Sequence, residues 1–195
     1  MLTWILLAVV AVVAVMLILI ARRPADFRIE RSTTIAAPPG AVMELIEDFH
    51  QWKRWSPWDR MDPTQVVTIG GAPRGKGATY EWVGQKNGQG RMEIIEHTPN
   101  QHVALQLDFI KPFASRNRCD FTVRPIAGGA DSEVVWSMTG RNDFMAKAFD
   151  LFMNMDRMLG RDFSRGLAAM KEEAEKSVGT RGGPPAAGSG VRSTM

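Results

Sequence analysis

Residues 142–177 read NDFMAKAFDLFMNMDRMLGRDFSRGLAAMKEEAEKS and carry the longest helical pattern after residue 22. Apolar residues recur there at steps of three and four, the spacing of one face of an α-helix. These residues are Met145, Phe149, Phe152, Leu159, Phe163, Leu167 and Met170. We expect one helix, capped by Asn142 and ending at Ser177, with Gly160 and Gly166 in its second half.

A second apolar row widens the apolar arc in the first half of this helix. The arc then covers about half of the circumference, which is more than packing on one flat surface needs. The row consists of Phe144, Ala148, Leu151, Met155 and Met158. Only short segments precede the helix, so we expect an α+β fold in which it lies across an antiparallel sheet.

The segments before the helix alternate apolar and polar residues, which is typical of half-buried strands. Residues 26–35 form the first such segment, and Asn87-Gly88 predicts a hairpin turn further on. Because each segment has one apolar face, we expect six or seven strands with one wet side. The later inward positions are Tyr80, Trp82, Met92, Ile94, Val103, Leu105, Leu107, Phe109, Cys119, Phe121, Val123, Val134, Trp136 and Met138.

Two short helical segments separate the first strand from the others. Pro38 and Pro39 can open a helix that ends near Asp48. The segment HQWKRWSPW follows at residues 50–58 and places a tryptophan at every third position. Such a cluster usually closes one end of a core and only sometimes stacks on a ligand.

Residues 1–21 contain Thr3 as the only polar side chain, enough helix to cross a bilayer core of about 30 Å. A cleaved signal peptide is the alternative, but no basic residue precedes the apolar run and no small-x-small site precedes Arg22. We therefore expect a single-pass transmembrane anchor, followed by a linker at residues 22–25. Because Arg22 and Arg23 follow the run directly, the positive-inside bias favours a cytoplasmic domain.

Residues 26–177 have the size of one domain with a single core. They hold 20 of the 24 basic residues and all 21 acidic ones, so their net charge is about −1. The signs are interleaved and form no basic stripe, which excludes a nucleic-acid reader. The lone Cys119 fits a reducing compartment. Gly, Pro, Ala and Ser dominate residues 178–195, so we expect a disordered tail.

The order of these elements resembles the SRPBCC superfamily, also called START-like or polyketide cyclase/dehydrase-like. The resemblance covers roughly residues 27–175 and includes TTIAAPPGAV at 33–42, WKRWSPW at 52–58 and FIKPF at 109–113. It implies a helix-grip fold, in which a curved sheet wraps the long helix and leaves an apolar cavity. Members of the superfamily mostly bind lipids, sterols or polyketides, and some catalyse cyclisation or dehydration.

The resemblance implies a domain that binds a lipid-like or polyketide-like small molecule. The apolar run at residues 1–21, which many soluble members of the superfamily lack, leads us to expect that this domain is tethered to the membrane, and we expect no cofactor. A cyclase- or dehydratase-type enzyme that acts in the same cavity is the alternative, and docking of a protein partner is a third possibility. The side chains expected to line the cavity are Tyr80, Trp82, Met92, Leu105, Leu107, Phe109, Phe121, Trp136, Met138, Phe149 and Phe152.

Asp156 and His50 are the candidate catalytic residues for the enzyme alternative. Asp156 lies within the apolar stripe of the helix, so its carboxylate should be paired, solvated or protonated. Arg31, which points inward on the first strand, is the candidate partner; otherwise Asp156 reaches water at the margin of the stripe.

The remaining titratable residues give no motif for catalysis or metal binding. The three histidines have no metal-ligand spacing on one element, so we expect no metal site. His97 and His102 flank a predicted turn, where solvent exposure is expected. Cys119 has inward parity and is expected to be a small core residue.

The FIKPF segment places apolar side chains at a predicted turn between two strands, where polar residues are usual. Two interpretations follow. Ile110 and Phe113 dip into a lipid surface, with Lys111 at anionic headgroups, and form the entrance for the ligand. Alternatively, Phe109 and Phe113 fold back onto the long helix.

Overall fold

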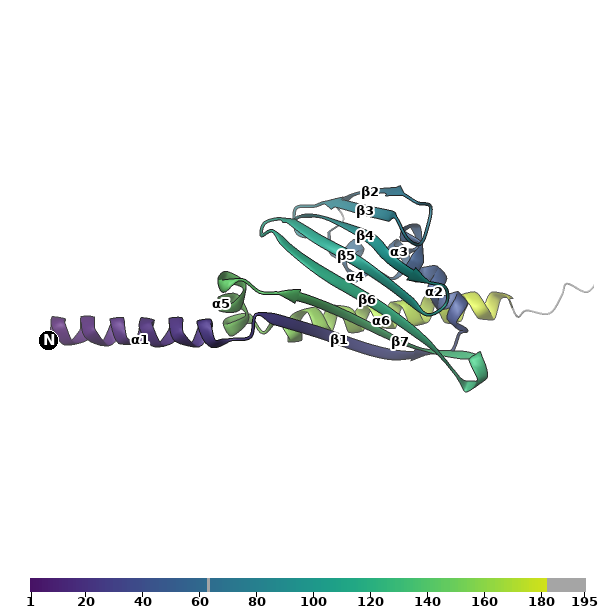
Figure 1. Cartoon of the computed structure of the whole chain (residues 1–195). Helices are drawn as coiled ribbons and strands as arrows, with labels where there is room; N and C mark the ends of the chain where they lie inside the picture. Colours follow the sequence, from purple (N-terminus) through teal and green to yellow (C-terminus); the bar gives the residue numbers. More distant parts are fainter. Residues whose placement is uncertain (63, 182–195) are drawn as a thin grey trace, which may run out of the picture.

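The structure is a computed structural model of the chain and describes residues 1–62 and 64–181 (Figure 1). Its helices are α1 (Leu2–Arg22), α2 (Pro39–Glu47), α3 (Phe49–Trp55), α4 (Pro57–Met61), η1 (Ala127–Gly129), α5 (Phe144–Met153) and α6 (Met155–Arg181). Its strands are β1 (Asp26–Ile35), β2 (Val66–Gly71), β3 (Ala78–Val83), β4 (Gln89–Thr98), β5 (His102–Lys111), β6 (Ser115–Ile126) and β7 (Asp131–Arg141). Most of the expected disordered tail, residues 182–195, lies outside the described residues.

The seven strands form one antiparallel sheet in the order β1-β7-β6-β5-β4-β3-β2. Strands β2 to β7 are neighbours in chain order, which confirms the expected meander, and β1 pairs with β7 at one edge. Asp26 pairs with Arg141, and Phe109 with Ser115. The start of β1, the end of β7 and the β5–β6 turn therefore share one end of the sheet. We call it the α1 end, because α1 leads into it, and the opposite end the far end.

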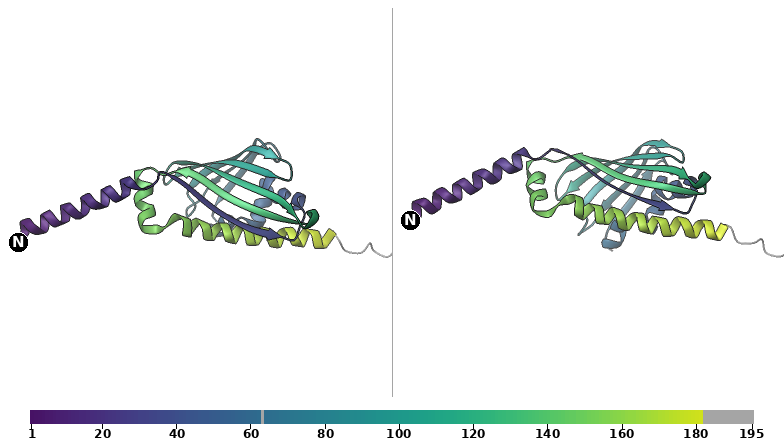
Figure 2. Two further views of the ribbon diagram at one scale, coloured as in Figure 1. Left: turned by 60° about the horizontal axis from the view of Figure 1, so that its bottom comes forward. Right: turned by 90° about the horizontal axis from the view of Figure 1, so that it is seen from below.

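Helix α6 lies against the inner face of the sheet, chiefly along β1 (Figure 2). It buries Phe163, Leu167, Met170 and Ala174, each with 2% or less of its surface exposed. Their spacing of four, three and four residues is the predicted helical face. Each fully buried apolar side chain of this size contributes about 1.5–3 kcal/mol, so this face holds α6 on the sheet.

The prediction of one uninterrupted helix from Asn142 to Ser177 is wrong in three respects. The chain leaves the helix at Asn154, which has a φ of 44° in the left-handed region, and α5 and α6 are separate helices. Asparagine tolerates this conformation better than most residues. The cap of α5 is Asp143 and not Asn142, because the Oδ1 of Asp143 accepts a hydrogen bond from the Ala146 N–H at 2.7 Å. At the other end, α6 continues past Ser177 to Arg181.

Helices α2 and α3 cover the inner face toward the far end, whereas α4 reaches the β3–β4 turn, where the Asn87 amide donates to the Trp58 carbonyl at 3.0 Å. Helix α2 ends at Glu47, as predicted, and Asp48 caps α3 by accepting a hydrogen bond from the His50 N–H. Trp52 and Trp55 are buried, and their indole N–H groups donate to backbone carbonyls of α2. The tryptophan segment therefore closes the core, with α4 as a third short helix.

Helix α1 extends outward from the α1 end of the sheet (Figure 1). Its length and composition are sufficient to cross a membrane, with a mean hydropathy of 3.2, and almost all of its side chains are exposed. At its end Ile20 is buried, and Arg23 donates to the carboxylate of Asp150 on α5 at 2.6 Å. The exit of α1 is thus fixed to α5.

Candidate functional site

The inner face of the sheet is apolar, but its exposure increases from the far end to the α1 end. On β5, Leu105 is fully buried, Leu107 keeps 8% of its surface exposed, and Phe109 is only partly buried. On β6, the exposed fraction rises in the same direction, from 0% at Phe121 to 8% at Asn117. The helices therefore cover the far half of this face more completely than the half near α1.

Aromatic side chains fill the far half. Trp136 of β7 stacks on Phe163 of α6 with ring centroids 4.2 Å apart, and on Phe121 at 4.8 Å. Trp55 meets Trp136 edge to face at 5.6 Å. Gly166 lies against this group, and a Cβ there would come within 2.8 Å of the Trp136 ring. This half is a packed core.

The half near α1 keeps accessible apolar side chains on its inner face. Phe27, Met92, Phe109 and Leu159 are partly buried and pack against the core. Phe109 also meets Trp82 edge to face at 5.7 Å. We call Phe27, Met92, Leu107, Phe109 and Leu159 the apolar mouth.

The side chains predicted to line a cavity divide between the core and the mouth. Those that are buried are Tyr80, Trp82, Leu105, Leu107, Phe121, Trp136 and Met138. Met92 and Phe109 are partly buried at the mouth. Phe149 is 48% exposed on α5. Phe152 lies in α5, and its side chain is outside the described part of the structure.

Sequence analysis missed two residues of the apolar mouth, Phe27 and Leu159. Phe27 shares the inward parity of Ile29 on β1, and Leu159 is one turn before Phe163 on the buried face of α6. Both signals were visible in the sequence. The sequence pattern did not indicate which end of the inner face the helices cover less completely.

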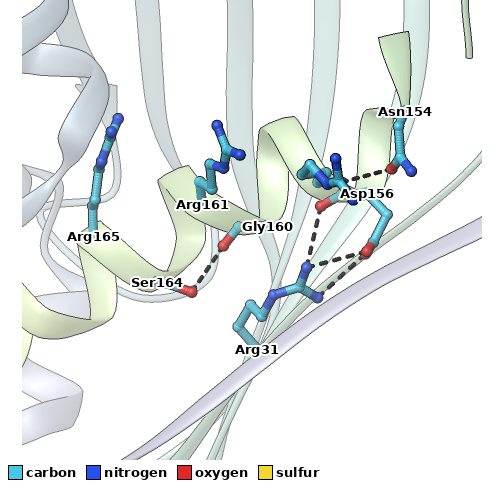
Figure 3. Close-up of a pocket in the computed structure, with 8 residues that line it drawn as sticks. Arg31, Asn154, Asp156, Gly160, Arg161, Ser164 and Arg165 are labelled. Carbon is cyan, nitrogen blue, oxygen red and sulfur yellow. Dashed lines mark hydrogen bonds and ion pairs between the residues drawn. The ribbon is translucent and has the colours of Figure 1, made fainter. Parts of the chain in front are cut away.

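Asp156 forms the predicted pair with Arg31 in an open polar groove of about 490 Å³ (Figure 3). The guanidinium of Arg31 donates to both carboxylate oxygens at 3.2 Å and to the Asp156 carbonyl at 3.1 Å. It lies against Gly160, where a Cβ would overlap it. The Asp156 side chain is 60% exposed. It is thus both paired and in contact with water, in a groove also lined by Arg161 and Arg165.

A second groove, of about 770 Å³, lies at the α1 end of the sheet. Its lining includes Arg28, Arg116, Arg118 and Arg141, whose parity places them on the outer face. Three of these arginines form ion pairs with neighbouring carboxylates. The first groove is lined mainly by charged residues and the second lies largely on the outer face, so neither is the expected apolar cavity between sheet and helix.

Each histidine has a carboxylate partner. His50 pairs with Asp48 at 2.8 Å, His97 with Glu47 at 2.6 Å and His102 with Asp120 at 2.9 Å. Burial raises the pKa of Asp48, but hydrogen bonds from His50 outweigh it and the pKa is lowered. The His97 and His102 side chains are only 21% and 27% exposed, so the prediction that they are simply solvated is wrong. Among the described residues, no three His, Cys, Asp or Glu side chains are grouped to hold a metal ion.

Two titratable groups on the inner face are held neutral by burial. Burial raises the pKa of the Cys119 thiol to about 12, so this residue is a core residue and a poor nucleophile. Burial also raises the pKa of Tyr80, whose hydroxyl donates to Asp59 at 2.9 Å. At these two positions the inner face is uncharged, whereas Arg31 of β1 carries a charge on the same face, beside Asp156.

Solved structures share this fold at low sequence identity. A protein from Chromobacterium violaceum is 16% identical, with a TM-score of 0.55 over 78% of this chain and 99% of that one. The Aha1 dimer from Colwellia psychrerythraea is 14% identical, with a TM-score of 0.55 over 76% of this chain and 96% of that one. The di-domain ARO/CYC BexL from the BE-7585A biosynthetic pathway is 18% identical, with a TM-score of 0.56 over 76% of this chain and 46% of that one. At these identities the likeness concerns the fold alone. No curated protein matches the sequence.

The family comparison covers the whole sheet and most of α6. Residues 26–175 match the family model described as polyketide cyclase / dehydrase and lipid transport. The match begins at the first residue of β1 and ends one residue after Ala174, the last buried residue of α6. The chain therefore belongs to the polyketide cyclase/dehydrase and lipid transport family.

Proposed function

We propose that this protein is a membrane-tethered domain that binds one hydrophobic small molecule at the apolar mouth. The observation that carries the proposal is the rise in exposure along the inner face, from the closed aromatic core to Leu107, Met92 and Phe109. The family description, which names polyketide chemistry and lipid transport, supports the same ligand class.

The mouth suits an apolar ligand on energetic grounds. Covering apolar surface gains about 25 cal/mol per Å² removed from water. The neutral thiol of Cys119 and the amide of Asn117 are the nearest polar groups on β6, and Asn117 already donates to Ser115 at 3.3 Å. A charged headgroup is therefore expected to remain outside the apolar mouth, where water can solvate it.

The enzyme alternative is named in the family description, but neither candidate catalytic side chain lies where it could act on a ligand at the mouth. Asp156 is bound by Arg31 and reaches water, and His50 is 63% exposed beside Asp48. Neither side chain belongs to the apolar mouth. Acid–base catalysis needs a group within hydrogen-bond reach of the reacting atom, so we propose a binding function without chemistry.

Photo-crosslinking with a diazirine-bearing palmitate tests the proposal on the full chain in lipid nanodiscs. Adducts on Met92, Leu107 or Phe109 are expected, together with adducts on α1 from the surrounding bilayer. Leu107→Trp should fill the mouth and remove the first set, while the α1 adducts remain as an internal control. Wild-type protein that gives adducts on α1 alone would contradict the proposed binding site.

We also propose that α1 spans the membrane and that the domain faces the cytoplasm, because Arg22 and Arg23 follow the apolar run. Protease treatment of membrane vesicles measures this orientation. The domain should be digested in inverted vesicles and protected in right-side-out vesicles. The reverse pattern would place it on the other side, and a soluble chain lacking residues 1–21 would indicate a signal peptide.

A further inference from the structure

Helix α5 exposes its apolar side. Phe144, Met145 and Phe149 are 47%, 69% and 48% exposed, whereas Lys147 and Asp150 are partly buried. A surface helix of a water-soluble domain has the opposite arrangement, with its apolar stripe against the core. Contiguous exposed apolar side chains of this kind mark a surface that another apolar phase covers.

The position of α5 indicates which phase that is. Its Asp150 accepts the ion pair from Arg23, immediately after α1. Only residues 23–25 separate α1 from β1, a spacer of about 10 Å at most when fully extended. Wherever α1 enters a bilayer, α5 must therefore lie close to the bilayer surface. Figure 2 shows α5 turned across the direction of α6, so that it lies over the end of the domain from which α1 leaves.

A second segment at the same end is apolar and exposed. In the β5–β6 turn, Ile110 is 48% and Phe113 79% exposed. Phe109 alone turns back toward the core, against Trp82. The interpretation in which Phe113 folds onto the long helix therefore does not hold. Lys111 of this turn is exposed beside these side chains and suits anionic headgroups.

We infer that α5 lies in the headgroup region of the bilayer, with Phe144, Met145 and Phe149 inserted and the β5–β6 turn dipping in beside it. An in-plane amphipathic helix buries its apolar face about 5–10 Å into this region. This inference rests on the proposed function, since it takes α1 as a membrane span. It adds that the apolar mouth opens onto the lipid surface, so its ligand is a membrane lipid that enters from the bilayer.

Nitroxide labels on the full chain in liposomes of phosphatidylcholine and phosphatidylglycerol measure the depth of α5. Single cysteines are introduced as Met145→Cys, Phe149→Cys and Phe113→Cys in a Cys119→Ala background. For each label, the ratio of collision rates with oxygen and with a water-soluble nickel chelate reports lipid exposure. The inference predicts a ratio well above the aqueous value at all three positions.

Two further labels serve as matched controls. Glu172→Cys on α6, whose native side chain is 73% exposed, lies about 25 Å along the helix from Met155 and should give the aqueous ratio. Val12→Cys reports on α1 itself. An aqueous ratio at Met145→Cys and Phe149→Cys with a lipid ratio at Val12→Cys would overturn the inference and leave the tether intact. An aqueous ratio at Val12→Cys would overturn the tether as well.

Discussion

At the scale of single residues, two glycines of α6 make room for two very different neighbours. A Cβ at Gly166 would come within 2.8 Å of the Trp136 ring, which is held between Phe121 and Phe163. A Cβ at Gly160 would meet the end of the Arg31 side chain. The first neighbour is rigid and buried, whereas the second is flexible and beside water.

Gly166→Ala and Gly160→Ala should therefore change the free energy of unfolding in different directions. Alanine gains about 1 kcal/mol over glycine in a helix, but overpacking a core costs about 1–3 kcal/mol. We expect Gly166→Ala to lower the free energy of unfolding, because Trp136 cannot move away. We expect Gly160→Ala to leave it unchanged or slightly raised, because Arg31 can turn into solvent and the exposed ion pair contributes about 0–1 kcal/mol.

Chemical denaturation of the two variants measures the difference. Gly179→Ala is the control for helix propensity alone, since a Cβ there meets nothing within 4 Å. Equal stability of the Gly166→Ala and Gly179→Ala variants would mean that the far half of the inner face is loosely packed, and that the core is not closed behind the mouth.

At the scale of elements, Asn154 determines that α5 and α6 are two helices. Its backbone is left-handed, with a φ of 44°, and its side-chain Oδ1 accepts a hydrogen bond from the Arg157 N–H at 3.0 Å. One residue thus ends α5 and caps α6. Asp150 reinforces the break, because its Oδ1 accepts a hydrogen bond from the Met155 N–H at 2.9 Å.

Asn154→Ala should destabilise the junction more than Asn154→Gly does. Alanine loses the cap, which costs about 1 kcal/mol, and must also adopt a left-handed conformation at a further cost of about 1–2 kcal/mol. Glycine adopts it freely and is itself an acceptable cap, so its cost should be a few tenths of a kcal/mol. Thermal unfolding of the full chain in detergent compares the two. Equal melting temperatures would show that the junction contributes nothing.

The same elements show what the sequence could predict. Alternation placed Leu107, Met92 and Phe109 on the inner face correctly, because a strand has only two sides and one of them was apolar. The break at Asn154 was missed because the apolar spacing continues through it, and because asparagine is only a moderately poor helix former. Phe149 was consequently expected to lie with the α6 stripe, whereas it lies on a separate helix.

Periodicity also cannot tell what covers an apolar face. It identified an apolar arc in residues 144–158 that was wider than a sheet requires, but packing on a sheet and exposure to lipid need the same residues. The distinction became visible only when the structure gave Met145 an exposure of 69% next to the exit of α1. The apolar mouth could not be predicted from the sequence either, because its location depends on how far α2–α4 extend over the sheet.

At the scale of the whole molecule, the apolar features gather at one end. The α1 end combines the apolar run of α1, the exposed side of α5, the β5–β6 turn and the apolar mouth, while the far end is closed by the tryptophan segment. In our proposal, a lipid leaves the bilayer at this end and passes the exposed side chains of α5 and of the β5–β6 turn before it reaches Leu107. The shared location of these features is the basis of our account, in which the tether holds the mouth over its ligand.

Native mass spectrometry of the full chain, released from lipid nanodiscs, tests the central claim most directly. We predict that wild-type protein retains one bound lipid after the surrounding lipids are stripped. The Leu107→Trp variant should lose this lipid. A matched Val66→Trp variant should keep it, because Val66 is exposed on β2, the edge strand opposite β1. Wild-type and Leu107→Trp proteins that carry the same lipids, or none, would contradict the claim that the apolar mouth binds a hydrophobic ligand.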